Sequence, residues 1–372
     1  MNKLQSEEER QLQEKTESTK PIRSLQLIGS KAFGGAEGWF KRFSLALDQM
    51  GHPTEIAVRK GYELDRDHWN GLTRHALPMR TVWDPFSRHE VKQLIKRLNP
   101  DIVQTYMGRA TRLTHLSPAA GPLHVARIGG YYKLDGYHHA HAWIGNTKGI
   151  CDYLVRNGFP AEKIFHIYNF YEAPADTGER VTRSEWGIPE DAWLLMTPGR
   201  LVPVKGHRYL LEAMSHLPRE INGRPLWLML LGDGPLQESL AEQASSLGIS
   251  DRLVWAGWQS NPTPFYQLCD MVVFPSLVEE TFGNVVIESW AYQKPLVCTN
   301  FRGAQEIATH GENAMVSPCE DSPALANSIE QTLKDEGLMQ TLTSCGQSEL
   351  KRVFSKSAVM SNYIKLYHEL IG

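Results

Sequence analysis

The stretch SLVEETFGNVVIESWAYQKPLV, residues 276–297, places two carboxylates, Glu280 and Glu288, on either side of a Phe-Gly-Asn turn. The run MVVFPS (271–276) is apolar and predicts a buried strand, whereas NVVIESWAYQ (284–293) has helical spacing. A strand that passes through a tight turn into a helix is the repeating unit of a parallel α/β sheet. The two acids therefore fall at the rim of a buried sheet, and their role depends on what the rest of the chain brings there.

The same alternation of strand and helix runs through both halves of the chain. In the front half, apolar runs predict strands at 24–29, 54–61, 101–107, 124–130, 142–148 and 163–170. In the second half, they predict strands at 193–200, 226–234, 252–258, 271–276, 295–300 and 314–318, and a long helical tail follows from Pro323. Alternating strands and helices favour right-handed crossovers and a mostly parallel sheet in each half.

At 372 residues the chain is too long for one ordinary core, so we expect two domains. The predicted fold class is α/β, with two doubly wound Rossmann-like domains that face a central cleft at the carboxyl ends of their strands. The predicted parts are a polar N-terminal tail (1–22), an N-terminal domain (23–172), a linker (173–186), a C-terminal domain (187–354) and a C-terminal helix that packs back on the first domain (355–372).

The composition argues against several classes of protein. No apolar run approaches the roughly 18 to 20 residues that a membrane span needs. The polar N-terminus lacks the apolar segment of a secretory signal. Five scattered cysteines without C-x-x-C spacing argue against a disulfide framework or a zinc site. We therefore expect a cytoplasmic protein without a nucleic-acid partner.

The formal net charge of −3 conceals an asymmetry between the two halves. Residues 24–172 carry 19 Lys and Arg against 13 Asp and Glu, a net charge of +6, whereas residues 187–354 carry 11 against 20, a net charge of −9. The segment RHEVKQLIKRLNP (88–100) concentrates positive charge on a predicted helix. Two interpretations stay open: contact with a phosphate-bearing partner or an anionic membrane, and an ordinary solvated face.

Two loops present backbone N–H groups at the start of a predicted helix. FGGAE places Gly34 and Gly35 after the first strand, and glycine lets the backbone approach a phosphate closely. The turn Thr281-Phe282-Gly283 precedes the helix that begins near Asn284. A helix N-terminus carries partial positive charge and favours anions. Each loop alone is also explained as a structural turn.

A third loop supplies cations. GRLVPVKGH (199–207) places Arg200 and Lys205 directly after a predicted strand, with glycines on both sides. Arg can hold a diphosphate with its planar fork, and Lys acts as a point charge. Carboxylates accept hydrogen bonds in pairs, so Glu280 and Glu288 suit the diols of a hexose and a ribose. Solvated cations, a helix cap and a surface acid explain each residue singly, but their gathering on one rim favours a ligand site.

Together these residues resemble family 4 of the retaining glycosyltransferases, which have the two-domain GT-B fold. The second half carries the resemblance in PGRLVPVKGH, LLGDGP, VWAGW, EETFGNVVIESWA and KPLVCTNFRGAQEIATHGENAMVSP. The front half adds FGGAE, GHPTEIAV, PDIVQTYM and KIFHIYNF. ARIGGYYK and GNTKGICDYLVRNGFP also resemble bacterial members that build lipopolysaccharide core or related surface glycans. The resemblance covers nearly all of the chain.

The resemblance implies a role for individual residues. Arg200 and Lys205 would bind the diphosphate of the donor. Glu280 would face the donor sugar, and Glu288 would hold the ribose. The other implied donor-binding residues are Gly199, Phe282, Gly283 and Asn284, with Gly34 and Gly35 across the cleft. The implied reaction is metal-independent transfer, with retention, of a hexosyl group from a nucleotide-diphosphate sugar to a glycan or glycolipid acceptor in lipopolysaccharide or other surface-polysaccharide biosynthesis. No cofactor is expected.

One position departs from that family. Many relatives carry a His in the front-half loop that this chain fills with Arg127-Ile128-Gly129-Gly130, so the role of that His cannot be transferred. His138, His139 and His141 lie nearby in YHHAHAW. A metal site at these histidines is one interpretation, and a solvated polar run is the other.

Three other functions stay open. A GT-A transferase needs an acidic D-x-D metal site, and Asp65-Arg66-Asp67 matches that string inside the polar run YELDRDHWN, where surface charge also explains it. A nucleotide-sugar epimerase would share the GT-B architecture and form a product without an acceptor. A non-catalytic nucleotide-sugar-binding protein would keep the site without turnover, although the intact cations and acids argue against it.

Overall fold

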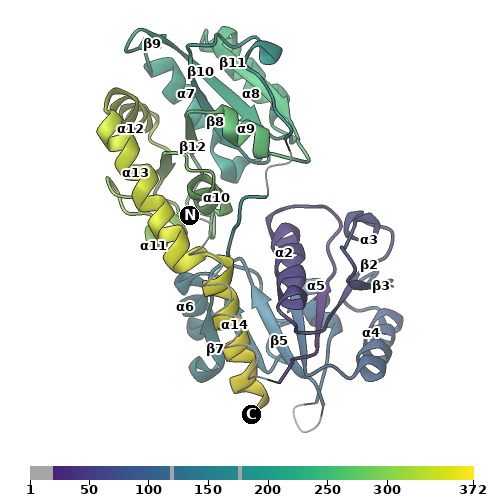
Figure 1. Ribbon diagram of the computed structural model, residues 1–372. Helices are drawn as coiled ribbons and strands as arrows, with labels where there is room; N and C mark the ends of the chain where they lie inside the picture. Colours follow the sequence, from purple (N-terminus) through teal and green to yellow (C-terminus); the bar gives the residue numbers. More distant parts are fainter. Residues whose placement is uncertain (1–19, 118–120, 175–177) are drawn as a thin grey trace. The chain divides into compact units, whose positions relative to one another are not determined.

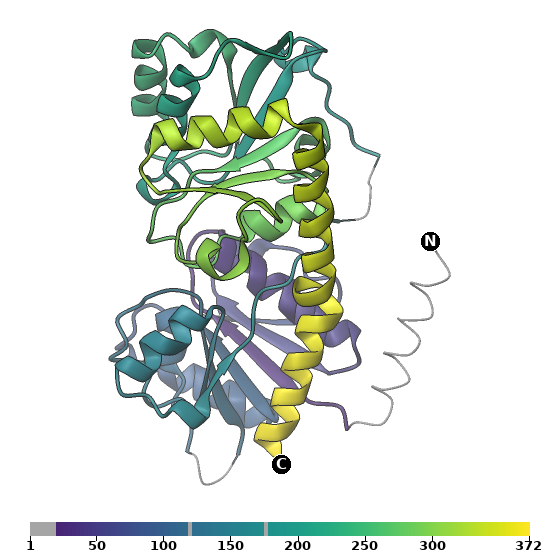
Figure 2. The same ribbon diagram turned by 90° about the vertical axis from the view of Figure 1, so that its left-hand side faces the viewer.

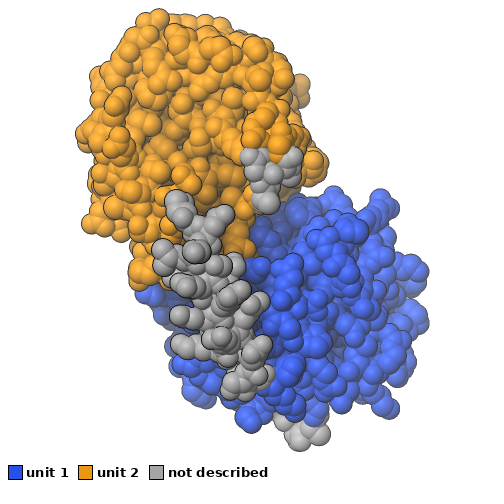
Figure 3. Space-filling model, viewed as in Figure 1, with its two compact units in different colours: residues 1–169, 356–372 blue, residues 170–355 orange. Residues whose placement is uncertain are grey.

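The computed structural model describes residues 20–117, 121–174 and 178–372, which divide into two compact units (Figures 1 and 3). Unit 1 comprises the described residues up to Asn169 together with Lys356–Gly372, and unit 2 comprises Phe170–Ser355. Most of the predicted N-terminal tail, residues 1–19, lies outside the described residues, as do residues 175–177 of the predicted linker.

Unit 1 contains a parallel sheet with the strand order β3-β2-β1-β4-β5-β6-β7 (Figure 1). Its strands are β1 (Ser24–Ile28), β2 (Thr54–Arg59), β3 (Thr73–Leu77), β4 (Ile102–Tyr106), β5 (Leu123–Ile128), β6 (Ala142–Gly145) and β7 (Ile164–His166). The sequence analysis did not predict β3, because this edge strand has the sequence TRHAL and only its last residue is buried. An exposed edge strand lacks the apolar run by which the other strands were found.

Helices cover both faces of the unit 1 sheet. They are α2 (Gly35–Gln49), α3 (Glu63–Arg66), α4 (Pro85–Leu98), α5 (Met107–Leu113), α6 (Lys148–Arg156) and α14 (Lys356–Ile371), with a short 3₁₀ turn η1 (Ala161–Lys163). On one face, Leu25 and Leu27 share a core with residues of α4 and α5. On the other face, α14 reaches the sheet through Tyr367, whose hydroxyl donates to Gln104 Oε1 at 2.9 Å. The two faces of β1 and β4 are therefore covered by different helices, as in a doubly wound sheet.

Unit 2 contains a second parallel sheet, with the order β11-β10-β8-β12-β13-β14 and a short antiparallel strand, β9, on β10. Its strands are β8 (Trp193–Pro198), β9 (Glu220–Ile221), β10 (Arg224–Leu231), β11 (Leu253–Gly257), β12 (Met271–Phe274), β13 (Leu296–Thr299) and β14 (Met315–Ser317). Its helices are α7 (His207–His216), α8 (Gln237–Ser246), α9 (Thr263–Leu268), α10 (Asn284–Ala291), α11 (Ala304–Ile307), α12 (Ser322–Lys334) and α13 (Glu336–Glu349). Short 3₁₀ turns, η2 (Ser184–Trp186), η3 (Pro203–Lys205) and η4 (Ser250–Arg252), lie between these elements, and a π-helix, η5 (Leu350–Phe354), follows α13 directly.

The predicted helical tail is not one helix. Asp335 has extended backbone angles and its carboxylate accepts a hydrogen bond from Leu338 N at 2.9 Å, so it ends α12 and caps α13. Figure 2 shows the chain changing direction between these two helices. Ser355 then separates η5 from α14. The tail therefore contributes two helices to unit 2 and one to unit 1.

The predicted fold class, α/β with two doubly wound parallel sheets, is confirmed. In unit 2 the strand order reverses between β8 and β12, and in unit 1 it reverses between β1 and β4. Open parallel sheets bind ligands at such a reversal, beyond the carboxyl ends of the strands. Across the part of the chain that the structure describes, none of the helices combines the length and the apolar character needed to cross a membrane.

A buried guanidinium at the end of β5 ties several parts of unit 1 together. Arg127 Nε donates to the Tyr363 hydroxyl of α14 at 3.0 Å, and Arg127 Nη2 donates to Asn169 Oδ1. The same guanidinium lies over the Trp39 ring of α2, 4.4 Å from the ring centroid. The chain leaves unit 1 at Asn169 and returns to it at Lys356. Arg127 thus fastens both segments to the sheet.

We predict that Arg127→Ala destabilises the protein. The change removes the donors of two buried acceptors and the stack on Trp39, for which we expect a loss of about 3 kcal/mol in the free energy of unfolding. Urea unfolding monitored by circular dichroism measures it. Arg156→Ala, which removes an exposed guanidinium of α6, is the matched control and should leave the midpoint unchanged. Equal midpoints for both variants would contradict the clamping role of Arg127.

Candidate active site

The strand reversal in unit 2 brings two loops together at the carboxyl ends of β8 and β12. An added Cβ at Gly206 would lie 1.9 Å from the Pro275 carbonyl oxygen, so only glycine allows this approach. Gly206 also has a φ of 65°, in the region that favours glycine. Leu277 N donates to Val204 O at 2.8 Å and joins the two loops directly. The backbone of the motif VKG therefore holds the loop that carries Glu280.

The loop after β10 packs against the same place. A Cβ added at Gly232 would lie 2.1 Å from the carbonyl oxygen of Gly199. A Cβ added at Gly234 would lie 2.5 Å from the carbonyl oxygen of Leu201. Leu201 N also donates to Asp233 O at 2.7 Å. Both glycines of LLGDGP therefore serve close packing of backbone on backbone, which gives the loop after β8 a fixed path.

Lys205 and Glu280, one from each loop, form an ion pair at this point. Lys205 Nζ lies 2.7 Å from Glu280 Oε2, and the side chains are only 20% and 16% exposed. Ser276 Oγ donates to the same carboxylate oxygen at 3.5 Å, and the Lys205 ammonium lies 4.9 Å from the centroid of the Phe274 ring. Partial burial reduces screening by water, so this pair is electrostatically stronger than a surface pair. The structure thus joins two residues that the sequence analysis selected separately.

Helix α10 begins directly after the Glu280 loop. Gly283 is its N-cap with a φ of 77°, and an added Cβ there would lie 2.5 Å from the Phe301 ring. Phe282 is buried, and an added Cβ at Gly303 would lie 2.3 Å from its carbonyl oxygen. The predicted helix start near Asn284 is therefore present and sterically defined. Its partial positive charge lies on the same loop as the ion pair.

Glu288, on α10, is oriented by a tyrosine that the sequence analysis missed. The Tyr266 hydroxyl donates to Glu288 Oε2 at 3.0 Å. The Tyr266 ring is buried and stacks on Tyr292, with 4.3 Å between the ring centroids. Burial, and then the Glu288 carboxylate, raise the pKa of Tyr266 well above its usual value, so the hydroxyl stays a donor. No pattern marked it, because a tyrosine among the apolar residues of α9 has the same signature as an ordinary core residue.

The remaining candidate residues are less closely associated with the Lys205–Glu280 pair. Arg200 has an exposed side chain, one residue after Gly199, and the added Cβ of Gly199 would contact the Lys205 side chain at 3.7 Å. Gly34 and Gly35 belong to unit 1, where Gly34 is the N-cap of α2 and Gly35 is its first residue. The structure therefore gathers the second-half candidates around the ends of β8 and β12, and keeps the front-half glycines in a different unit.

The candidate metal ligands have other partners. Asp65 pairs with Arg74 at 3.4 Å and Asp67 with Lys41 at 2.8 Å, so the D-x-D string is a surface ion-pair segment. Among the described residues, no three His, Cys, Asp or Glu side chains gather to hold a metal ion. His139 and His141 are partly buried and bond to the backbone, at Thr111 O and at His124 N. The alternative of a solvated run therefore applies only to the exposed His138.

Comparison with known proteins identifies this arrangement. Residues 179–349 match the family described as Glycosyl transferases group 1, and residues 33–173 match Glycosyltransferase Family 4. LpsE, a lipopolysaccharide core biosynthesis glycosyltransferase of Rhizobium meliloti (strain 1021), is 32% identical over an alignment of 348 residues that covers 90% of this chain and 95% of the relative. The chain belongs to the group 1 glycosyltransferases.

Solved structures show the same fold for this glycosyltransferase. A glycosyltransferase from Rickettsia africae ESF-5 superposes with a TM-score of 0.80 at 18% identity, over 95% of this chain and 99% of that one. Anabaena Alr3699/HepE in complex with UDP-glucose superposes with a TM-score of 0.79 at 18% identity, over 94% of this chain and all of that one, 100%. The predicted family and the predicted GT-B architecture are confirmed.

A buried histidine of this glycosyltransferase also escaped the sequence analysis. His207, the first residue of α7, is 2% exposed, and neither ring nitrogen has a hydrogen-bond partner among the described residues. Burial, and then the neighbouring Lys205, lower the pKa of His207 to about 4. An imidazole kept neutral in the fold takes up its proton on unfolding at mildly acidic pH. It therefore lowers stability as the pH falls below its unfolded pKa of about 6.5.

We predict that His207→Leu weakens this pH dependence. Between about pH 7 and pH 5, the unfolding free energy of the wild type should fall by about 2 kcal/mol more than that of the variant. Urea unfolding at both pH values measures the difference. His216→Gln, at the exposed end of the same helix, is the control and should follow the wild type. Parallel pH profiles for wild type and His207→Leu would contradict a neutral buried imidazole.

Proposed function

We propose that the chain is a retaining, metal-independent glycosyltransferase that moves a hexosyl group from a nucleotide-diphosphate sugar to a glycan or glycolipid acceptor. The observation that carries the proposal is the Lys205–Glu280 pair at the strand reversal of unit 2, 2.7 Å apart and partly buried. A cation suits a diphosphate, and a carboxylate suits sugar hydroxyls. The Anabaena protein of the same fold is in complex with UDP-glucose, which supports a donor of this class.

The name of LpsE supports a role of this chain in the biosynthesis of surface glycans. LpsE is a lipopolysaccharide core biosynthesis glycosyltransferase, and 95% of its length aligns with this chain. We therefore assign the chain to lipopolysaccharide or other surface-polysaccharide biosynthesis, and expect it in the cytoplasm at the inner face of the membrane. A lipid-linked or membrane-bound acceptor would be reached from that side.

In the proposed reaction, the bond between the sugar C1 and the diphosphate oxygen breaks, and the acceptor oxygen bonds to C1 on the same face. The proton of the acceptor hydroxyl goes to the departing phosphate oxygen. Negative charge grows on the diphosphate as the bond breaks, and Lys205, Arg200 and the N-terminus of α10 would stabilise it electrostatically. Lys205 needs little reorganisation for this task, because Glu280 and the Phe274 ring already hold its ammonium group.

Glu280 and Glu288 would each bind one of the two sugars of the donor. Glu280, beside Lys205, would accept hydrogen bonds from the transferred hexose, and Glu288, on α10, would accept them from the ribose. A carboxylate recognises a diol best when its rotamer is fixed, since less side-chain freedom is then lost on binding. The Tyr266 hydroxyl, 3.0 Å from Glu288 Oε2, supplies that restraint. Tyr266 is thus a positioning residue for donor binding.

We predict that Lys205→Ala lowers kcat on the order of 100-fold, by analogy with the loss of one donor to a developing oxyanion. We expect a loss of about the same size for Glu280→Gln, because this change removes the charged acceptor for the hexose and the partner that holds Lys205 in place. Donor candidates come first from calorimetry with UDP, GDP, ADP and CDP sugars, and transfer is then measured with and without acceptor. Lys351→Ala, an exposed cation of η5, is the control and should keep wild-type kcat. Near wild-type turnover by Lys205→Ala would mean that Lys205 does not take part in the reaction.

Two further measurements test the type of reaction. Activity that EDTA abolishes and Mg²⁺ restores would overturn metal independence, and product formed without acceptor would indicate an epimerase.

We predict that Tyr266→Phe raises the KM for the donor about fivefold to tenfold and leaves kcat nearly unchanged. A hydrogen bond to a charged group contributes about 1.5–3 kcal/mol, and we expect roughly half of this, about 1–1.4 kcal/mol, to be lost from donor binding. The preference for a ribose donor over its 2′-deoxyribose analogue should fall by a similar factor. Tyr292→Phe removes a hydroxyl from the same stack that reaches Thr263 Oγ1 at 2.8 Å, and it should keep the preference. An equal loss with both donors would mean that Tyr266 serves packing alone.

A further inference from the structure

The segment that leads into α4, and the exposed side of that helix, form an aromatic and basic surface on unit 1. Trp83 is 81% exposed and Phe86 is 52% exposed. No other large apolar side chain among residues 20–117, 121–174 and 178–372 is as exposed as Trp83. We call this the α4 surface, and it consists of Trp83, Phe86, Arg88, Lys92, Lys96 and Arg97, all of them exposed.

The helix itself separates this surface from the core. Val91, Leu94 and Ile95 are buried in the core of unit 1. Arg88, Lys92 and Lys96 follow one another at a spacing of four residues and therefore form one stripe along the helix. Residues 80–97 contain five Lys and Arg against two Asp and Glu, a net charge of +3 without the histidine.

One of those two acids is already engaged in the fold. Asp84 is the N-cap of α4, and its carboxylate accepts from Ser87 Oγ at 2.6 Å and from Phe86 N at 3.1 Å. This cap fixes the turn that presents Trp83 and Phe86, so the aromatic rings project from a defined helix end. The other acid, Glu90, is partly buried. The exposed charge of the surface is therefore almost wholly positive.

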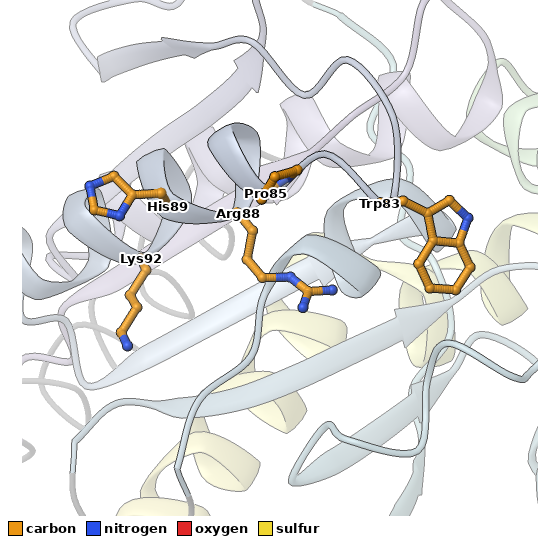
Figure 4. Close-up of a pocket in the computed structure, with 5 residues that line it drawn as sticks. All are labelled: Trp83, Pro85, Arg88, His89 and Lys92. Carbon is orange, nitrogen blue, oxygen red and sulfur yellow. The ribbon is translucent and has the colours of Figure 1, made fainter.

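A shallow groove of about 370 Å³ opens on the α4 surface (Figure 4). In the figure, Arg88 and Lys92 extend from the same side of the helix, and Trp83 projects from the segment before it. Trp83, Pro85, Arg88, His89 and Lys92 line the groove. Cations and an indole thus meet at one solvent-exposed place.

We propose that the α4 surface docks unit 1 on an anionic lipid surface. Trp83 and Phe86 enter the headgroup region, and the stripe of Arg88, Lys92 and Lys96 faces the lipid phosphates. Tryptophan favours the membrane–water interface, because its ring is apolar and its N–H is polar. Basic residues on one side of a helix add attraction to anionic lipids. The inference deepens the membrane-side location in the proposed function, but the surface contains none of the donor-site residues.

The charges alone do not distinguish lipid from other anionic partners. A soluble polyphosphate would be bound by the cations alone, and its binding would be insensitive to Trp83. A soluble anionic glycan would also stack a sugar ring on Trp83, but it would not carry the protein to a lipid vesicle. A lipid interface uses both the cations and the burial of exposed apolar surface. Trp83 has the most exposed indole among the described residues, and it directly precedes a capped helix that carries a basic stripe; this combination favours the lipid.

The test is sedimentation of the full chain with vesicles of phosphatidylcholine alone or mixed with phosphatidylglycerol, at low and high salt. We expect binding to the mixed vesicles only, weakened by salt. Trp83→Ala should lower the partition coefficient about tenfold, and Arg88→Glu with Lys92→Glu should lower it on the order of 100-fold. The controls are Trp258→Ala, an indole of unit 2 that is 62% exposed, and Arg156→Glu, an exposed cation of unit 1, which should bind as the wild type does.

Equal binding to neutral vesicles, or wild-type binding by Trp83→Ala, would overturn the proposal. Competition by dextran sulfate that is unaffected by Trp83→Ala would assign the surface to a soluble polyanion instead. Donor hydrolysis and thermal midpoints are measured in parallel. The α4 variants should keep both, so a failure of lipid binding is distinguishable from a failure of the proposed transferase function, which the Lys205 and Glu280 variants test.

Discussion

The candidate site depends on one close approach, in which the Pro275 carbonyl oxygen occupies the space that a side chain at position 206 would need. This contact locks the loop after β8 to the loop after β12, and the Leu277–Val204 hydrogen bond continues it. Lys205 lies next to the contact on one loop and Glu280 lies a short distance along the other. Their ion pair is therefore a consequence of where two backbones touch, and the glycine at 206 is a requirement of the charge arrangement.

Local positive charge matters more in this unit than the overall charge does. Residues 187–354 carry a net charge of −9, which repels a nucleotide diphosphate at long range. Salt screens such distant charges over about 8–10 Å, whereas a partly buried cation acts on a ligand at contact. Lys205, Arg200 and the start of α10 lie together on the loops at the ends of β8 and β12. The acidic remainder of the unit is therefore compatible with an anionic donor.

Much of this could be predicted from the sequence, because buried parallel strands are continuous apolar runs and glycine-rich turns mark their ends. The exposed edge strand β3 and the break at Asp335 could not, since one lacks an apolar run and the other lies inside a uniform helical pattern. At the site, Lys205 and Glu280 were found by residue type and position. Tyr266 and His207 were not, because the role of each depends on burial, and that of Tyr266 depends also on its contact with Glu288 in another helix.

Arg127 shows how a departure from the family resemblance is explained by packing. A free guanidinium at the end of β5 would be a natural substitute for the histidine that many relatives carry in this loop. In this chain, however, the guanidinium is buried, donates to Asn169 and Tyr363, and stacks on Trp39. Binding a ligand would require breaking buried, charge-assisted hydrogen bonds at a cost of about 1.5–3 kcal/mol each. Arg127 at the end of β5 therefore stabilises unit 1, and the proposed chemistry depends on Lys205, Glu280 and Glu288 of unit 2.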